Sequence, residues 1–208
     1  MSEILLGHAD GRVIGATEVN AMFRFRKQVF QDLLGWEVDS REGMERDAFD
    51  DLDPVYMIAR TPQYQIQGCW RLLPTTGPYM LRDVFPELLE GQAVPCAPDV
   101  WELSRLAVLP TEQEARERGS MCPVTLRMFR AVTEFAQRNG IRRYVFVTSV
   151  GVERMLKRMG VPLARFGTGK AVRLGKVLSV VLWVEVNAQL RRAVGLETEQ
   201  APALPLAA

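Results

Sequence analysis

Residues 66–73 read Ile-Gln-Gly-Cys-Trp-Arg-Leu-Leu, a short apolar stretch that contains one charged side chain, Arg71. A stretch of apolar and aromatic residues of this length predicts a β-strand. A second stretch, residues 100–109, reads Val-Trp-Glu-Leu-Ser-Arg-Leu-Ala-Val-Leu and contains two charges, Glu102 and Arg105. The chain therefore has two predicted core strands that carry charge.

Other predicted elements alternate between strands and helices. Further strands are predicted at residues 55–60, 144–149 and 177–186. Apolar residues recur at helical spacing in other segments. These predicted helices are residues 17–34, 123–138 and 151–159 and the segment from Asn187. The alternation favours a layered α/β fold, and the unequal strands and connections predict a mixed sheet flanked by helices.

Length and composition indicate one globular domain. The chain has 208 residues, of which 48% are hydrophobic and 25% charged, which is ordinary for a folded domain. We expect residues 1–197 to form the domain and the Ala-, Leu- and Pro-rich tail 198–208 to be disordered. The N-terminus lacks a signal-peptide pattern, and the longest apolar stretch, residues 177–186, is too short to span a membrane. A cytoplasmic protein without a membrane span is expected.

Charge is unevenly distributed although the formal net charge is only +1. Residues 1–53 carry 12 Asp and Glu against 6 Lys and Arg, whereas residues 141–192 carry 11 Lys and Arg against 2 acids. The distribution predicts a region that attracts cations and a face that attracts anions, unless these are simply two solvated surfaces. With so small a net charge, no global field recruits nucleic acid or membrane.

Several common kinds of site are excluded by residue type and spacing. The three cysteines have no CxxC spacing and the chain has a single histidine, His8. A disulfide scaffold, a zinc site of the usual kind and a Ser/His/Asp triad are therefore not expected, and no metal is predicted. Residues 167–170, Gly-Thr-Gly-Lys, lack the remaining positions of a phosphate-binding loop.

The charges inside the predicted strands have two interpretations. A buried charge is costly unless it is paired, so Arg71 with Glu102, or Glu102 with Arg105, can form an ion pair that stabilises the sheet. Alternatively, the charges belong to a functional site. Residues three apart face opposite sides of a regular strand, so Glu102 and Arg105 share a pocket only if the strand bulges.

Further charged and aromatic residues precede these strands. Arg26 and Phe30 are four apart on the first predicted helix and share one face. Trp36 follows the end of that helix, and Asp47 and Asp50 are three apart in the acidic segment 36–54.

At these positions the sequence resembles the acyl-homoserine-lactone (autoinducer) synthases, over about residues 20–190. The resemblance rests on an ordered set of residues: Arg26, Phe30, Trp36, Asp47, Asp50, Arg71, Phe85, Glu102 and Arg105. The surrounding residues agree in three places, which are residues 68–76, Met80-Leu81 and residues 101–105. The resemblance implies a single-domain, GNAT-like three-layer fold in which a mixed β-sheet splays open between flanking helices.

The resemblance also implies a reaction. Its substrates would be S-adenosylmethionine and an acyl group carried on acyl carrier protein, with coenzyme A as the donor in some members. The enzyme would form an amide, close a lactone and release methylthioadenosine, with no metal or redox cofactor. The implied catalytic residues are Glu102, Arg71 and Arg105. The implied S-adenosylmethionine site consists of Arg26, Phe30, Trp36, Asp47, Asp50, Phe85, Trp101 and Arg105.

The chemistry assigns a role to each kind of residue. Asp47 and Asp50 can hold the cationic groups of S-adenosylmethionine, and Arg26 or Arg105 can hold its carboxylate. Glu102 is the candidate general base that deprotonates the ammonium, directly or through a water. A backbone N–H at the bulge could stabilise the oxyanion.

The acyl donor would contact two further sets of residues. The expected acyl pocket consists of Trp70, Met80, Leu103, Leu106, Met128, Phe146, Val147 and Thr148. The expected docking surface for an acidic carrier protein consists of Arg154, Lys157 and Arg158. Family members that make 3-oxo products tend to have Thr at the position matching Phe146, so we expect an unsubstituted or otherwise modified medium-to-long acyl chain.

Two other functions compete with this interpretation. A GNAT-type acyl-CoA-dependent N-acyltransferase acting on another amine would need a glycine-rich pyrophosphate loop, which residues 112–124 lack. A nucleic-acid-binding module would use the basic C-terminal half, but aromatic residues are not interleaved with its charges.

Overall fold

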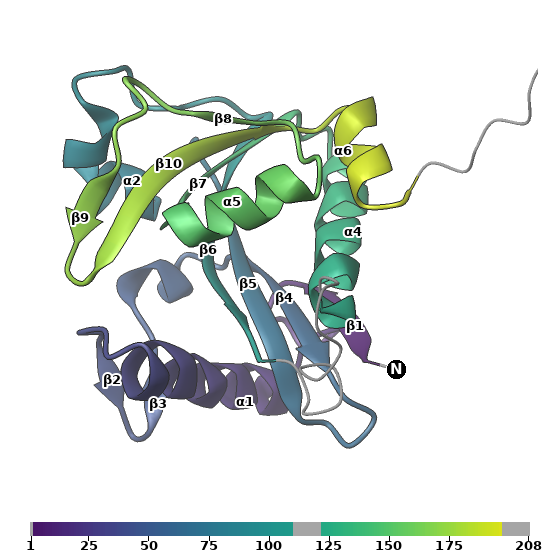
Figure 1. Ribbon diagram of the computed structural model, residues 1–208. Coiled ribbons are helices and arrows are strands. Elements are labelled where there is room, and N and C mark those ends of the chain that lie inside the picture. The colour runs from purple at the N-terminus through teal and green to yellow at the C-terminus, as the bar shows by residue number, and fades with distance from the viewer. Residues whose placement is uncertain (1, 110–121, 197–208) are drawn as a thin grey trace, which may run out of the picture.

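A single mixed β-sheet runs through the computed structural model, which describes residues 2–109 and 122–196 (Figure 1). The strand order is β1-β4-β5-β6-β7-β10-β8, and β9 pairs with another part of β10. The strands are β1 (Glu3–Gly7), β4 (Val55–Arg60), β5 (Ile66–Pro74), β6 (Val100–Val108), β7 (Arg143–Ser149), β8 (Leu163–Arg165), β9 (Val172–Leu174) and β10 (Val177–Glu185). Of the described pairs, β6 with β7 is parallel and the others in this sheet are antiparallel.

Helices cover both faces of the sheet. They are α1 (Ala16–Lys27), α2 (Met80–Asp83), α4 (Pro123–Arg138), α5 (Val150–Arg158) and α6 (Ala188–Ala193). Successive residues of a strand point to opposite faces, and in β4 they enter different cores. Met57 packs in the core that includes α4 and α5, whereas Tyr56 packs in the core that includes α1. The predicted layered α/β fold with a mixed sheet is therefore confirmed.

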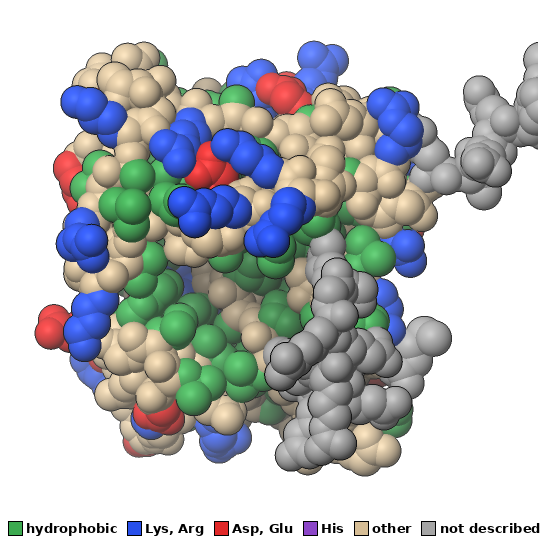
Figure 2. Space-filling model, in the orientation of Figure 1, with side chains coloured by type: hydrophobic (Ala, Val, Ile, Leu, Met, Phe, Trp, Pro, Cys, Tyr) green, Lys and Arg blue, Asp and Glu red, His purple; other side chains and the backbone are tan. Residues whose placement is uncertain are grey.

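The sheet splays open between β6 and β7. These two strands pair only where Val100–Glu102 meets Arg143–Val145, although β6 continues to Val108 and β7 to Ser149. Beyond these pairs the strands diverge (Figure 1). Figure 2 shows a hollow in the middle of this face, with hydrophobic side chains around it. The predicted splayed sheet is thus present.

The predicted elements agree with the structure except in a few places. The first helix begins at Ala16 and continues as a π-helix over Gln28–Leu33, before Gly35 with its positive φ of 64°. The acidic segment 36–54 contains a short hairpin, β2 (Ser40–Arg41) with β3 (Met44–Glu45), and a 3-10 helix, Ala48–Asp51. Strand β1 and the short elements α2, β8 and β9 were not predicted, because they are brief and lack periodicity.

Some expectations fall outside the described residues. These are the tail 198–208 and most of the loop region 112–124. In the part of the chain that is described, no helix has the length and apolar character needed to cross a membrane.

Leu182→Ala is expected to lower the free energy of unfolding by about 2–5 kcal/mol, because it leaves a cavity in the core under α4 and α5. Leu182 is 0% exposed, whereas Leu178, on the same strand, is 44% exposed. The matched variant Leu178→Ala should change the free energy by less than about 0.5 kcal/mol. Urea unfolding measures both values, and equal losses would contradict this description of the core.

Candidate active site

A β-bulge in β6 brings the charged residues of this strand to one face. Cys69 pairs with Ala107 and Arg71 pairs with Ser104, so Trp70 lies opposite two residues, Arg105 and Leu106. Arg105 has a φ of 58°, in the left-handed region that few non-glycine residues adopt. The extra residue turns Arg105 toward the same face as Glu102 and Ser104. The bulge required for Glu102 and Arg105 to share a pocket is therefore present.

Six charged side chains meet on this face, between β5, β6 and α1. The arginines are Arg26, Arg71 and Arg105, and the acids are Glu45, Asp47 and Asp50. We call this set the ion-pair cluster. Its formal charges cancel, so guanidinium and carboxylate groups can be buried together without a net charge.

Asp50 and Arg26 form the innermost part of the cluster. Arg26 donates from Nη1 and Nη2 to the two oxygens of Asp50, at 2.8 and 3.0 Å, and from Nε to Glu45. Burial opposes the ionisation of Asp50, but Arg26 and Arg71 hold its pKa well below the usual range. The Arg26 side chain is 1% exposed and its donors are occupied by protein carboxylates. In this arrangement it supports the site from beneath.

Asp47 and Arg105 are the members that reach the surface of the cluster. Their side chains are 16% and 14% exposed, whereas Arg71 is 0% exposed. Arg105 Nη2 lies 2.7 Å from Asp47 Oδ2, and Arg105 Nε donates to Glu45 at 3.0 Å. Arg71 donates to Asp47 Oδ2 at 3.1 Å and to the Ser104 hydroxyl at 3.1 Å. A ligand that carries both charges therefore meets a carboxylate and a guanidinium side by side.

Glu102 is buried beside the cluster. Its two oxygens accept backbone hydrogen bonds from Met80, at 3.0 Å, and from Leu81, at 2.7 Å. Burial raises the pKa of Glu102, and it outweighs the opposing effects of these N–H groups and of Arg71 and Arg105. A carboxylate with a raised pKa is a stronger base than an exposed one, so Glu102 is suited to accept a proton from a substrate.

An aromatic stack adjoins the exposed part of the cluster. Phe30 and Trp36 are parallel, with ring centroids 5.1 Å apart and an interplanar angle of 14°. The backbone N–H of Trp36 donates to the Phe30 carbonyl at 2.8 Å, at the end of the π-helix. The Arg105 guanidinium lies 5.7 Å from the Phe30 centroid, and Trp36 remains 38% exposed. The stack can therefore offer an aromatic surface to a cation.

The fold does not bring every predicted residue to this cluster. Trp101 points to the opposite face of β6 and packs edge-on against Phe135 of α4, with centroids 5.8 Å apart. Phe85 packs against a neighbouring apolar cluster, as does Phe49, whose ring lies 5.5 Å from the Arg71 guanidinium.

Comparison with known proteins identifies the family. The autoinducer synthase profile matches residues 11–192, which is most of the chain. The chain belongs to the autoinducer synthase family. An acyl-homoserine-lactone synthase of Pseudomonas aeruginosa is 42% identical over 185 residues, covering 86% of this chain and 89% of that protein. As an autoinducer synthase, the chain is an acyltransferase that makes acyl-homoserine lactones.

Solved structures agree with this autoinducer synthase in fold. The crystal structure of the synthase LasI has a TM-score of 0.84 and 36% identity, covering 97% of this chain and 99% of that one. The structure of the coenzyme-A-dependent synthase BjaI, with S-adenosylmethionine and isopentyl-CoA, has a TM-score of 0.80 and 26% identity, covering 95% and 92%. A Lactobacillus plantarum protein assigned as an N-acetyltransferase has a TM-score of 0.59 at 16% identity, which shows the GNAT-like fold alone.

The residues predicted for the acyl pocket of the synthase are divided between two faces of the sheet. Those on the α4 side share one core: Trp70, Leu103, Leu106, Met128 and Phe146. Val147 points to the other face, and Met80 lies at the ion-pair cluster, where its sulfur accepts from Arg71 and Arg105 at 3.1 and 3.3 Å. Thr148, two residues after Phe146, is half-buried. Five of the eight predicted acyl-pocket residues therefore lie in the same core, on the α4 side of the sheet.

The predicted docking residues lie together on α5 of the synthase. Arg154, Lys157 and Arg158 are exposed, and Lys157 Nζ lies 2.8 Å from the buried Glu153 carboxylate. Figure 2 shows Lys and Arg side chains gathered over α5, along one side of the hollow. Three of the eleven Lys and Arg residues in 141–192 thus lie on α5, beside the opening of the splayed sheet.

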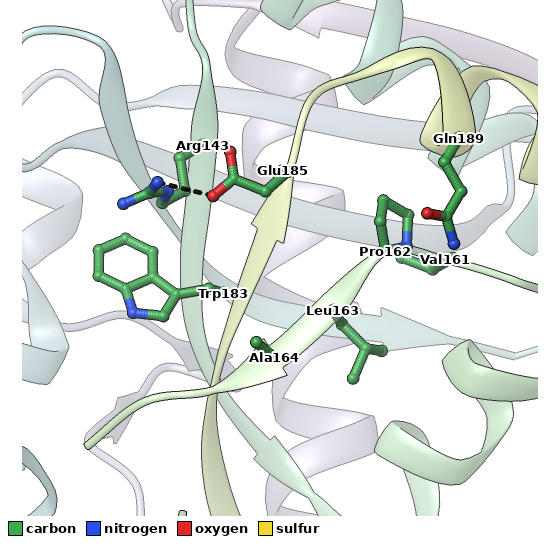
Figure 3. A pocket seen from close by; sticks show the side chains of 8 residues that line it. All are labelled: Arg143, Val161, Pro162, Leu163, Ala164, Trp183, Glu185 and Gln189. Atoms are coloured by element: carbon green, nitrogen blue, oxygen red, sulfur yellow. Dashed lines mark ion pairs between the residues drawn. The ribbon is translucent and has the colours of Figure 1, made fainter.

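A groove of about 500 Å³ lies elsewhere on the synthase, at the edge formed by β8 and α6 (Figure 3). Its lining includes Trp183 and Gln189, and Arg143 Nη2 lies 2.6 Å from Glu185 within it. None of the residues predicted for the active site lines this groove. Within the described residues, no three His, Cys, Asp or Glu side chains are grouped so that they could hold a metal ion.

One member of the cluster, Glu45, and two residues that contact it, Ser104 and Tyr56, were not predicted from the sequence. Glu45 is 0% exposed and joins Arg26 to Arg105, and the Ser104 hydroxyl accepts from Arg71. Glu45 lies two residues before Asp47 in the acidic segment, and this position was the available signal. Ser104 offers no such signal, because an isolated serine in a strand is common.

Arg26→Ala is expected to lower the free energy of unfolding by about 3–5 kcal/mol, because Glu45 and Asp50 each lose a buried cationic partner and the cluster keeps an uncompensated negative charge. Arg24 is exposed on the same helix, and Arg24→Ala should change the value by less than about 0.5 kcal/mol. Urea unfolding at neutral pH measures both. Similar small losses in the two variants would show that the cluster does not stabilise the fold.

Proposed function

We propose that this autoinducer synthase transfers an acyl group from acyl carrier protein to the amine of S-adenosylmethionine and then closes the homoserine lactone. The observation that carries the proposal is the partly exposed pair of opposite charges, Asp47 and Arg105, 2.7 Å apart beside an aromatic stack. S-adenosylmethionine presents an ammonium, a carboxylate and a sulfonium, which need an anion, a cation and an aromatic surface. Both substrates are cytoplasmic, so the reaction is proposed to take place in the cytoplasm.

The proposed binding roles follow from exposure. Asp47 holds the ammonium, since it is the exposed carboxylate of the cluster, and Arg105 holds the substrate carboxylate. Phe30 and Trp36 face the sulfonium. Arg26, Arg71 and Asp50 keep these groups in position from below. Trp101 lies on the other face of the sheet, so in this proposal it contributes through packing.

The first chemical step forms the amide. Glu102 takes a proton from the substrate ammonium, directly or through a water, because only the free amine is nucleophilic. The amine nitrogen attacks the thioester carbonyl, the C–N bond forms and the C–S bond breaks. The carrier thiolate leaves and takes up the second proton, which the nitrogen loses as it becomes a neutral amide. Donors fixed near the bulge would stabilise the tetrahedral oxyanion.

The second step closes the ring. A carboxylate oxygen of the acylated intermediate attacks its own γ-carbon, the C–O bond forms and the bond from that carbon to the sulfonium breaks. Methylthioadenosine leaves as a neutral thioether, so this step needs no proton transfer. It depends on holding the carboxylate close to the γ-carbon, which assigns particular importance to Arg105.

The proposed donor is acyl carrier protein, which is acidic and fits the basic surface of α5. Coenzyme A is the second candidate, because the similar synthase BjaI is described as coenzyme-A-dependent. Phe146 cannot donate a hydrogen bond to a 3-oxo group, so we propose an unsubstituted or otherwise modified medium-to-long acyl chain. Mass spectrometry of products formed by the purified enzyme from S-adenosylmethionine and either donor tests these proposals together. Formation of no lactone with either donor would overturn them.

Glu102→Gln is expected to slow acyl transfer by about 10²–10⁴-fold while the affinity for S-adenosylmethionine stays nearly unchanged. The wild-type rate should fall as the pH falls through the raised pKa of Glu102, since the base must be unprotonated. Single-turnover rates across pH and calorimetric binding measure the two effects. Parallel loss of binding and rate would instead assign Glu102 to holding residues 80–81 in place.

Replacing Arg154 and Arg158 with Glu is expected to raise the KM for acyl carrier protein at least about tenfold, because attraction between opposite charges becomes repulsion. The KM for S-adenosylmethionine should stay the same. The matched control reverses Arg12 and Arg138, whose side chains are 88% and 73% exposed on other parts of the molecule. Equal effects of the two double variants would show that α5 is not the docking surface.

A further inference from the structure

Asp50 accepts more hydrogen bonds than either of the other two acids of the ion-pair cluster. Its Oδ1 accepts from Arg26 at 2.8 Å and from Arg71 at 2.9 Å. Its Oδ2 accepts from Arg26 at 3.0 Å and from the backbone N–H of Asp47 at 2.9 Å. The position of Asp50 therefore determines where Arg71 and the Asp47 backbone lie, and through them where the exposed Asp47 carboxylate points.

A tyrosine that neither the sequence analysis nor the proposed mechanism uses also contacts Asp50. The Tyr56 hydroxyl donates to Asp50 Oδ1 at 2.8 Å. Tyr56 lies on β4 directly opposite Arg71 on β5, so both side chains leave the sheet on the same face and reach the same oxygen. The Tyr56 ring is 2% exposed and packs edge-on against Phe23, with centroids 6.2 Å apart.

Tyr56 and Asp50 also line a cavity of about 180 Å³, together with Phe23, Arg46 and Asp53. Of the predicted active-site residues, only Asp50 reaches this cavity. A water molecule there could donate to Asp50, but it would not be fixed by covalent attachment to the sheet. The tyrosine hydroxyl supplies a donor whose position is set by β4.

We propose that Tyr56 is a positioning residue for the acyltransferase reaction, whose hydroxyl fixes Asp50 so that Asp47 is held in the orientation that binds S-adenosylmethionine. This inference rests on the proposed function, because Asp47 is assigned there to the substrate ammonium. Burial, followed by the neighbouring Asp50 charge, raises the pKa of Tyr56 far above its ordinary value. The hydroxyl therefore remains a donor throughout the working pH range.

The test compares two tyrosine hydroxyls that are buried to the same degree. Tyr56→Phe removes the donor to Asp50 and keeps the ring. Tyr144→Phe is the matched control: Tyr144 is 1% exposed, and its hydroxyl donates to the Val132 carbonyl at 3.0 Å in the core beneath α4. Each variant is assayed for the KM of S-adenosylmethionine, the KM of the acyl donor, kcat and urea unfolding.

Tyr56→Phe is expected to raise the KM for S-adenosylmethionine by about 5–20-fold, because Asp50 loses one of the hydrogen bonds to its charged carboxylate. The KM for the acyl donor should stay unchanged. Tyr144→Phe should lose comparable stability with neither KM altered. The split between the two KM values is the decisive readout, because a structural role alone would not produce it.

Two results would overturn the role of Tyr56. One is an unchanged KM for S-adenosylmethionine in Tyr56→Phe, and the other is an equal rise in the KM of both substrates, which indicates general loosening. Failure of the proposed function is distinguishable, because the wild-type enzyme would then make no lactone from S-adenosylmethionine in the same assay.

Discussion

The active site depends on mutual neutralisation of six charges, four of which are buried. The side chains of Asp50 and Glu45 are fully enclosed, and Arg26, Arg71 and Arg105 surround them with the opposite charge. Desolvation of each group is costly, and paired geometry with several hydrogen bonds offsets that cost. The buried residues of the cluster bond to one another, and only Asp47 and Arg105 reach the surface. The two residues that a substrate can contact are thus held in place by residues that it cannot reach.

Backbone geometry decides which side chains join this cluster. The bulge at Arg105 places Glu102, Ser104 and Arg105 on one face, whereas a regular strand would turn Arg105 into the opposite core. The π-helix at the end of α1 has a comparable effect, because it ends where Trp36 returns to stack on Phe30. Local departures from regular structure are common next to active sites.

Much of this arrangement could be predicted from sequence. The long elements α4, β5, β6 and β10 were found within one or two residues, since their apolar periodicity is clear and they form the core. Five of the six members of the cluster were predicted as site residues, through a resemblance. Glu45 was missed, because its ion pair with Arg26 joins residues that are distant in the sequence. Trp101 was assigned to the substrate site although it packs on the other face; nothing in its local sequence separates these outcomes. Ser104 and Tyr56 were missed because single hydroxyls in strands carry no pattern.

The short parallel junction between β6 and β7 divides the charged groups of the molecule between two parts of the chain. Every charged member of the cluster comes from residues before Val108, whereas the basic helix α5 belongs to the part after β7. Only three residue pairs connect the strands at this junction. Under the proposed function, the groups that bind S-adenosylmethionine and the surface that docks the acyl carrier therefore lie in different parts of the chain. These parts meet at this short junction and in the shared core beneath α4.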